Sequence, residues 1–263
     1  MRANALRSAW VGGQRTVNGW LAIPAPFAAE VMAHQGWDSL TVDLQHGVVD
    51  YQTAVGMLQA ISTTAVVPMV RAPWLDPGII MKLLDAGSYG VICPMIHDRA
   101  ETETLVRACR YPPRGNRSMG PIRATLYAGD DYARHADETV LAIAMIETAA
   151  ALDHLDEILA VEGLDGIYVG PSDLAAALGH PAVLDPTEPS VVAAIEHVLR
   201  ATKRHGRWAG IHTGTPDSAR RMHALGFDFV SLASDARLLA LKSRESLDEV
   251  RGGVAPDLTA RTY

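Results

Sequence analysis

The chain of 263 residues is long enough for one large domain or two small ones, and an apolar content of 48% supplies a sizeable core. The formal net charge of -7 argues against nucleic acid and anionic membranes as partners. Cys93 and Cys109 lack metal-binding spacing, so we expect reduced thiols and a cytoplasmic setting. The N-terminus lacks the apolar core of a signal peptide, and no segment approaches ~18 apolar residues, so we expect a soluble protein.

One unit recurs along the chain: an apolar run, a small loop and an amphipathic helix. A short helix over Asn4–Val11 opens the chain, with Leu6 and Trp10 on one face, as a cap over an open barrel end would have. The expected strands are Val17–Ile23, Ser39–Leu44, Val66–Val70, Gly90–Met95, Leu141–Ile146, Gly166–Val169, Trp208–Ile211 and Phe227–Leu232. The expected helices are Phe27–Gln35, Tyr51–Ser62, Pro77–Ala86, Arg99–Arg110, Ala149–Val161, Ser190–His205, Pro216–Leu225 and Ala236–Val250.

Eight strand–helix units in about 250 residues predict an α/β fold, a (β/α)8 TIM barrel, as a single domain over 1–263. A doubly wound sheet would need a glycine-rich turn after its first strand, where this sequence reads IPAPF. We find no interdomain linker. Tyr111–Thr139 is one long irregular segment, of the kind that is usually functional or part of an interface. The tail after about residue 252 is expected to be loosely ordered.

Two acids follow two adjacent predicted strands. Glu147 follows Leu141–Ile146, and the stretch Val161–Leu174 (VEGLDGIYVGPSDL) has a strand that ends at Val169 and Asp173 before a helix expected at Leu174. The carboxyl ends of parallel strands share one mouth, so the two carboxylates should converge. As hard oxygen ligands they suit Mg²⁺ or Mn²⁺ better than zinc. The alternative for each is a helix N-cap.

Two further strand ends carry groups for acid–base or oxyanion chemistry. Arg71 can neutralise an oxyanion or hold a carboxylate in two-point fashion, and its alternative is a buried ion pair with an acid of the site. Asp43 and His46 lie three residues apart, where an acid can fix the tautomer of an imidazole and raise its basicity. Trp20 and His212 also end strands and could line the mouth.

The positions of the lysines argue against Schiff-base chemistry. Carbon–carbon lyases that work without metal use a lysine to form a Schiff base with the carbonyl substrate. The three lysines, Lys82, Lys203 and Lys242, all fall within predicted helices, and none ends a strand. Imine chemistry is therefore not expected.

Taken together these residues resemble the HpcH/HpaI aldolase family, metal-dependent class II pyruvate aldolases on a barrel of the phosphoenolpyruvate/pyruvate type. The resemblance covers roughly residues 4–250. It is carried by short motifs in order: DLQH (43–46), VRAP (70–73), LLDAG (83–87), YPPRGNRS (111–118), IET (146–148) and the stretch Val161–Leu174.

The resemblance implies roles for particular residues. Glu147 and Asp173 would bind a divalent metal (Mg²⁺, Mn²⁺ or Co²⁺), and Arg71 would hold the ketone oxygen of pyruvate. His46, paired with Asp43, would transfer a proton through a metal-bound water. The implied substrate contacts are, for the carboxylate, Gly170, Pro171, Ser172 and Asp173, and, for the aldehyde end, Trp20 and His212. Relatives form trimers paired into hexamers, and Asp85 would reach the site of a neighbouring subunit.

Two positions depart from the family pattern, which often has Glu before the His and Gln two residues before the metal Glu. Here they are Gln45 and Met145, so substrate preference should change while the reaction class is kept. The expected activity is reversible cleavage of a 4-hydroxy-2-oxo acid to pyruvate, or an analogue, and an aldehyde through a metal-stabilised enolate. The alternatives are a CoA-thioester lyase of the malyl-CoA or citramalyl-CoA type and a non-catalytic barrel that binds metal and oxo acid.

Overall fold

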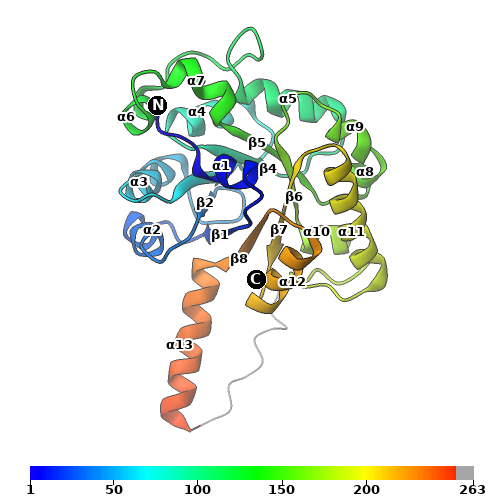
Figure 1. Ribbon diagram of the computed structural model, residues 1–263. Helices are drawn as coiled ribbons and strands as arrows, with labels where there is room; N and C mark the ends of the chain where they lie inside the picture. Colours follow the sequence, from blue (N-terminus) through cyan, green and yellow to red (C-terminus); the bar gives the residue numbers. More distant parts are fainter. Residues whose placement is uncertain (253–263) are drawn as a thin grey trace.

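The computed structural model describes residues 1–252, and in it eight parallel strands close into a barrel in chain order, with β8 paired to β1 (Figure 1). The strands are β1 (Thr16–Leu21), β2 (Ser39–Asp43), β3 (Val67–Arg71), β4 (Gly90–Cys93), β5 (Leu141–Ile146), β6 (Gly166–Val169), β7 (Trp208–Thr213) and β8 (Phe229–Ser234). The helices are α1 (Ala5–Val11), α2 (Pro26–Ala33), α3 (Tyr51–Ile61), α4 (Pro77–Asp85), α5 (Arg99–Cys109), α6 (Ile122–Ala128), α7 (Tyr132–Thr139), α8 (Ala149–Asp153), α9 (Leu155–Leu159), α10 (Pro171–Ala177), α11 (Pro189–Arg204), α12 (Pro216–Leu225) and α13 (Asp235–Arg251). The predicted (β/α)8 TIM barrel is confirmed.

The strands separate two apolar cores. In β5, Leu141, Ile143 and Met145 pack inside the barrel, whereas Ala142 and Ala144 belong to the larger core between the strands and the outer helices. This alternation follows from the two-residue period of a strand. Both faces of each strand are therefore buried, which explains why the strands read as continuous apolar runs.

The opening helix α1 closes the N-terminal end of the barrel, as its sequence predicts. The side chain of Asn4 caps the helix by accepting from the amides of Leu6 and Arg7. Trp10 stacks on Phe229 with 4.7 Å between ring centroids, and Leu6 is buried in the same inner core. The barrel consequently opens to solvent at the other end, where the strands have their carboxyl termini.

Most predicted bounds hold within a residue or two, but some predictions need correction. The segment Tyr111–Thr139 is not irregular throughout, because it contains α6 and α7, separated at Gly129 with φ of 111°. Ala149–Val161 is two short helices, α8 and α9, that meet at His154. The fourth strand ends at Cys93 rather than Met95, whose φ of 54° is left-handed. The tail predicted after Gly252 lies outside the described residues.

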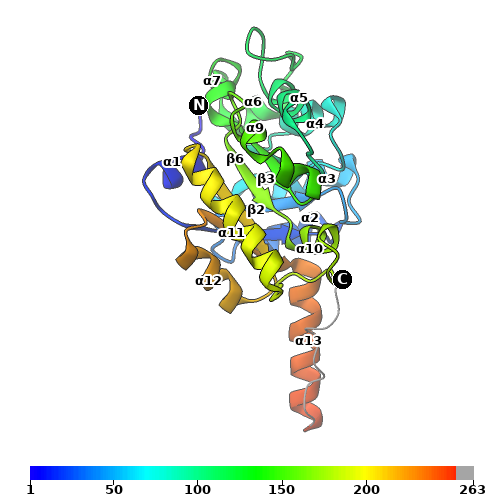
Figure 2. The ribbon, with the colours of Figure 1, turned by 90° about the vertical axis from the view of Figure 1, so that its right-hand side faces the viewer.

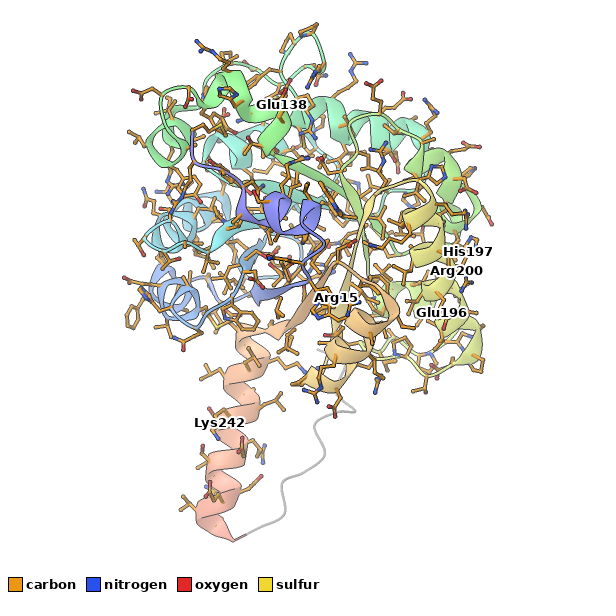
Figure 3. All side chains as sticks on the ribbon, viewed as in Figure 1. Arg15, Glu138, Glu196, His197, Arg200 and Lys242 are labelled. Atoms are coloured by element: carbon orange, nitrogen blue, oxygen red, sulfur yellow. The ribbon has the colours of Figure 1, made fainter. Side chains whose placement is uncertain are left out.

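The last helix, α13, leaves the barrel as a long projection (Figures 1 and 2). It packs on β1 and β8, while Leu239, Leu247 and Val250 are exposed along it. Figure 3 labels Lys242 on the projecting part, and all three lysines do lie in helices. Among the residues described, no helix is long and apolar enough to span a membrane.

Candidate active site

A cavity of 450 Å³ opens at the carboxyl ends of the strands. All the site residues predicted from the sequence line it, except Glu147 and Asp85. Those that line it are Trp20, Asp43, His46, Arg71, Gly170, Pro171, Ser172, Asp173 and His212. The barrel thus gathers residues from five strands at one mouth.

Asp43 and Arg71 form a buried ion pair at the ends of β2 and β3. They are opposite each other in the strand register, and Arg71 donates from Nε and Nη2 to the two carboxylate oxygens at 2.8 and 2.6 Å. Burial opposes ionisation of Asp43, but the hydrogen bonds and charge of Arg71 outweigh it and hold the pKa of Asp43 below its usual value. The alternative considered for Arg71 from the sequence, a buried ion pair with an acid of the site, is therefore present, and the acid is Asp43.

The Asp43 carboxylate also organises its neighbours. Trp20 donates from its indole N–H to Oδ2 at 3.1 Å, and the guanidinium of Arg71 lies 4.8 Å from the centre of the Trp20 ring. The backbone amides of Gln45 and His46 donate to Oδ1 at 3.0 and 3.3 Å. Asp43 thus fixes the loop that carries His46, whose side chain is exposed at the mouth. Pairing of Asp43 with the imidazole itself stays a prediction.

Glu147 follows β5, does not line the cavity and is only 2% exposed. Its Oε1 accepts from the amide of Met95 at 2.8 Å, and a Cβ at position 170 would come within 2.4 Å of its Oε2, so only glycine fits beside it. Burial, helped by the negative charge of Asp173, raises the pKa of Glu147 to about 7 against the opposing effect of the Met95 amide. The N-cap alternative for Glu147 fails, because Thr148 caps α8.

Asp173 lies in the first turn of α10, which corrects the predicted helix start. The helix begins at Pro171, whose fixed φ suits the first helical position, and not at Leu174. Gly170 is the N-cap and no side chain caps the helix, so Asp173 is not an N-cap and is exposed to the cavity. Beside it, the Oγ of Ser172 is buried without a hydrogen-bond partner. That hydroxyl is available to a ligand in the cavity.

His212 lies within β7 rather than just after it and forms part of an aromatic wall. Its Nδ1 is 3.0 Å from the hydroxyl of Tyr168, and its ring meets Trp20 edge-on with 4.9 Å between centroids. Burial, helped by the positive charge of Arg71, lowers the pKa of His212 to about 3. His212 is therefore neutral at physiological pH and acts as a hydrogen-bonding group without charge.

Asp85 lies apart from this cavity, at the end of α4. Its carboxylate accepts from Nη2 of Arg117 at 2.6 Å, and it is 27% exposed. Arg117 is fully buried against the rings of Tyr111 and Tyr132. The arginine motif of residues 111–118 therefore holds Asp85 at the surface.

The sequence did not indicate several residues that line the cavity, among them Tyr168, Leu184, Arg237 and Arg244. Tyr168 occupies an inward position of β6, which counting back by two from Gly170 would have indicated, because Gly170 was already expected at the site. Leu184, Arg237 and Arg244 come from a loop and from α13, where only tertiary packing brings them to the mouth. A surface helix rich in charge gives no such signal.

A divalent metal fits Glu147 and Asp173 chemically. The charge of Asp173 adds to the cost of ionising the buried Glu147, and a cation bound between the two carboxylates would relieve that cost. Within residues 1–252 no group of three or more His, Cys, Asp or Glu residues is arranged as a metal site. The remaining ligands would have to be water or substrate oxygens, as is usual for Mg²⁺.

Comparisons with known proteins agree with this architecture. The family model described as HpcH/HpaI aldolase/citrate lyase matches residues 18–241. The chain is 44% identical over 248 residues to a hydroxypyruvate/pyruvate aldolase of Rhizorhabdus wittichii, covering 94% of this chain and 99% of the relative. It is 36% identical over 240 residues to a 4-hydroxy-2-oxo-heptane-1,7-dioate aldolase of Klebsiella pneumoniae, covering 90% of each.

A solved structure of a member of this family has the same fold. An HpcH/HpaI aldolase/citrate lyase family protein from Burkholderia cenocepacia superposes with a TM-score of 0.88 at 32% identity, covering 94% of this chain and 99% of that one. The present chain belongs to the HpcH/HpaI aldolase/citrate lyase family.

Proposed function

We propose that the protein is a class II pyruvate aldolase, a carbon–carbon lyase that reversibly cleaves a 4-hydroxy-2-oxo acid to pyruvate, or a close analogue, and an aldehyde. One observation carries the proposal: Arg71, held by Asp43, shares a strand-end cavity with Asp173, near the buried Glu147, in a chain of this family. Relatives at 36–44% identity are named aldolases of this kind.

In this proposal Glu147 and Asp173 hold a divalent cation, Mg²⁺, Mn²⁺ or Co²⁺. When bound, such a cation supplies Lewis-acid chemistry at the oxygens of the 2-oxo acid. The protein holds Glu147 in place through the Met95 amide, and the missing side chain at Gly170 leaves room for its carboxylate. The raised pKa of Glu147 makes loss of its proton and arrival of the cation coupled events.

Arg71 stabilises negative charge on the ketone oxygen as the C3–C4 bond of the substrate breaks. A guanidinium has five N–H groups, and two of them donate to Asp43. The others remain for the oxyanion, and the fork is already oriented before substrate binds. The ion pair and the catalytic role are therefore compatible, since Asp43 positions the group that Arg71 presents.

The hydroxyl of Ser172 and the backbone amides of Gly170, Ser172 and Asp173, next to Pro171, bind the carboxylate of the 2-oxo acid. The supporting observation is the buried Ser172 Oγ without a partner in the cavity wall, which a carboxylate oxygen would satisfy. This end of the substrate lies next to Asp173, so the carboxylate and the ketone oxygen reach the same side of the cavity.

His46 moves the proton at the reacting hydroxyl. In the cleavage direction it takes the proton of the C4 hydroxyl, and in the aldol direction it returns a proton to that oxygen. Its exposed position at the mouth suits exchange with solvent. Trp20 and the neutral His212 form the wall on the aldehyde side, where His212 accepts or donates one hydrogen bond without adding charge.

A coupled assay tests the proposal. Metal-stripped protein is given Mg²⁺, Mn²⁺ or Co²⁺ and a racemic 4-hydroxy-2-oxo acid, and released pyruvate is followed with lactate dehydrogenase and NADH. We expect pyruvate release that stops with chelator and in Asp173→Asn. Binding of pyruvate without release from any 4-hydroxy-2-oxo acid would instead favour a non-catalytic oxo-acid-binding barrel.

A homo-oligomer, a trimer or hexamer, is part of the proposal. Asp85 does not line the cavity of its own chain, so any catalytic part must be played in a neighbouring one. Large apolar side chains are exposed on the segment after Arg117, whose α6 packs on α4, and separately along α13, and a second copy would cover them. They are Met119, Ile122, Leu126, Leu239, Leu247 and Val250.

We propose further that residues 1–263 form one barrel domain and that the protein works in the cytoplasm. The support for the first is that the strands of the described chain close one barrel without a linker. The support for the second is that Cys93 and Cys109 are free and buried.

A further inference from the structure

The loop of residues 178–188, which connects α10 to α11, contributes Leu184 to the wall of the cavity. The two ends of this loop are close together, because Nε2 of His180 lies 2.7 Å from the hydroxyl of Ser190 at the start of α11. Leu184 is partly buried and lines the cavity, so its side chain is available to a bound molecule. No role has yet been given to it.

The next residue, Asp185, joins this loop to the segment between β7 and α12. Its Oδ1 accepts from the backbone amide of Gly214 at 3.0 Å, and its Oδ2 accepts from the hydroxyl of Thr215 at 3.1 Å. Thr215 is the N-cap of α12, where its side chain accepts from the amide of Ser218. Both oxygens of the Asp185 carboxylate therefore hold the loop against the capped start of a helix, directly after a barrel strand.

The loop approaches the end of β7 so closely that little room is left for a side chain at position 214. A Cβ at Gly214 would lie 3.0 Å from Oδ2 of Asp185 and 3.3 Å from the Cβ of Leu184. Glycine at this position therefore permits the close approach. Gly214 comes two residues after His212, which also lines the cavity. Leu184 thus extends the wall that His212 begins, on the side proposed above for the aldehyde.

The chemistry of Leu184 limits what it can recognise. A leucine side chain has no hydrogen-bonding atom, so it stabilises a ligand only by removing carbon groups from water. Ala22 and Leu241 also line the cavity and add apolar surface to its wall. A hydroxyl or a charged group placed against Leu184 would lose water without gaining a partner. The ligand group that fits this part of the wall is therefore a hydrocarbon chain.

We infer that Leu184 is a specificity-determining residue that contacts the apolar carbon chain of the aldehyde, and that Asp185 is the positioning residue that holds Leu184 in the cavity wall. The inference rests on the proposed aldolase function, because only then does an aldehyde occupy the cavity beside pyruvate. The contact is remote from the reacting carbonyl, so it acts on the binding of the aldehyde and not on the chemical step. Asp185 acts only through Leu184.

The experiment compares a long and a short apolar aldehyde, pentanal and acetaldehyde, with saturating pyruvate and metal-loaded full-length protein. The readout is the ratio of kcat/KM for pentanal to that for acetaldehyde, with kcat and KM also determined separately. The variants are Leu184→Ala, Leu184→Asn, Asp185→Ala and Asp185→Asn. Leu225→Ala and Asp217→Ala are the matched controls, because both residues are exposed on α12 and lie outside the cavity.

We expect the wild type to favour pentanal and the ratio to fall about tenfold in Leu184→Ala, as loss of apolar carbons from a binding wall predicts. Leu184→Asn keeps the size of the side chain but makes it polar, and should lower the ratio at least as much. The loss should appear as a higher KM for pentanal with kcat nearly unchanged. Asp185→Ala should also lower the ratio, and Asp185→Asn should keep most of it, because an amide can accept from Gly214 and donate to Thr215. Both controls should keep the wild-type ratio.

Three results would overturn the specificity role: a wild type that does not favour pentanal, an unchanged ratio in both Leu184 variants, or an equal loss for both aldehydes, which would make Leu184 structural. A wild-type ratio in Asp185→Ala would overturn the positioning role. Deuterium exchange into pyruvate without aldehyde is measured on the same samples, and every variant should keep it. Exchange with an unchanged ratio defeats this inference alone. Absence of exchange in the wild type defeats the aldolase function and this inference with it.

Discussion

Asp43 and Arg71 are the last paired residues of β2 and β3, and their side chains join in two hydrogen bonds of 2.8 and 2.6 Å. The register of the two strands thus sets the position of the Arg71 backbone, and the two hydrogen bonds to Asp43 hold its guanidinium. Arg71 is 9% exposed, so nearly all of its cationic surface is either paired with Asp43 or directed to the cavity. In the proposed reaction this ion pair is a positioning device for the oxyanion.

The first prediction concerns the fork of Arg71. Arg71→Lys keeps a positive charge but loses the two-point contact with Asp43, so the charge is no longer held at the ketone oxygen. We expect kcat to fall about 10²–10³-fold, as for loss of one oxyanion donor. Metal affinity, measured by titration calorimetry, should change little. Kinetics near wild type would show that Arg71 has a structural role only.

The second prediction concerns acid stability. The pKa of Asp43 is lowered in the folded protein, so the carboxylate adds stability that is fully present above its unfolded pKa of about 3.8 and is lost as pH falls through the lower folded value. Asp43→Asn should destabilise the protein by roughly 3–5 kcal/mol at pH 7, because Arg71 loses a buried counter-charge. Urea denaturation at pH 7, 5, 4 and 3 should show this difference shrinking only below about pH 4. A difference that stays constant down to pH 3 would contradict the assignment.

The third prediction separates proton transfer from metal binding. His46→Ala should lose about 10²–10⁴ in kcat, the usual contribution of a general base, and should still bind metal and pyruvate. Metal content after dialysis is measured by elemental analysis. His34→Ala is a matched control, since His34 is also an exposed histidine but lies far from the cavity, on the loop after α2. Loss of metal from His46→Ala would make His46 a ligand.

The fourth prediction tests contribution across subunits. Asp85→Asn keeps an acceptor for the buried Arg117, so the fold should survive, but activity should fall at least tenfold if Asp85 acts as a charge in a neighbour's site. Mixing it with His46→Ala under subunit exchange should restore activity, because mixed sites can then contain both intact residues. A fully active monomer, or mixtures no more active than the separate variants, would rule this out.

The sequence predicts the barrel well because its units are local. Each strand is an apolar run of a few residues and each helix has its own period, so Leu141–Ile146 and Gly166–Val169 match the structure. The positions of the candidate site residues could be predicted for the same reason, since Asp43, Arg71 and Glu147 end or follow such runs. The predicted start of α10 at Leu174 is wrong because a proline that follows a strand can itself be the first residue of a helix, as Pro171 is.

What the sequence could not give depends on tertiary packing. The segment Tyr111–Thr139 forms α6 and α7 because Ala124, Tyr132 and Ala136 pack in the inner core. The sequence of a short polar helix does not indicate such packing. The stripe of Arg237 and Arg244 reads as a solvated helix face, as does the outer face of α11 with Glu196 and Arg200 (Figure 3). The sequence does not distinguish these two helix faces, because the difference between them depends on the direction in which α13 leaves β8.

The most direct measurement of the central claim needs no aldehyde. An aldolase that forms the enolate of pyruvate must exchange the methyl protons of bound pyruvate with solvent, so metal-loaded protein in D₂O should remove the pyruvate methyl signal from the proton NMR spectrum. We predict that exchange stops with chelator and in Glu147→Gln and Asp173→Asn, and that borohydride traps no adduct, because all three lysines lie in helices. Saturation-transfer NMR on the same samples reports pyruvate binding. If metal-loaded wild-type protein binds pyruvate and incorporates no deuterium over hours, the pyruvate aldolase account is contradicted.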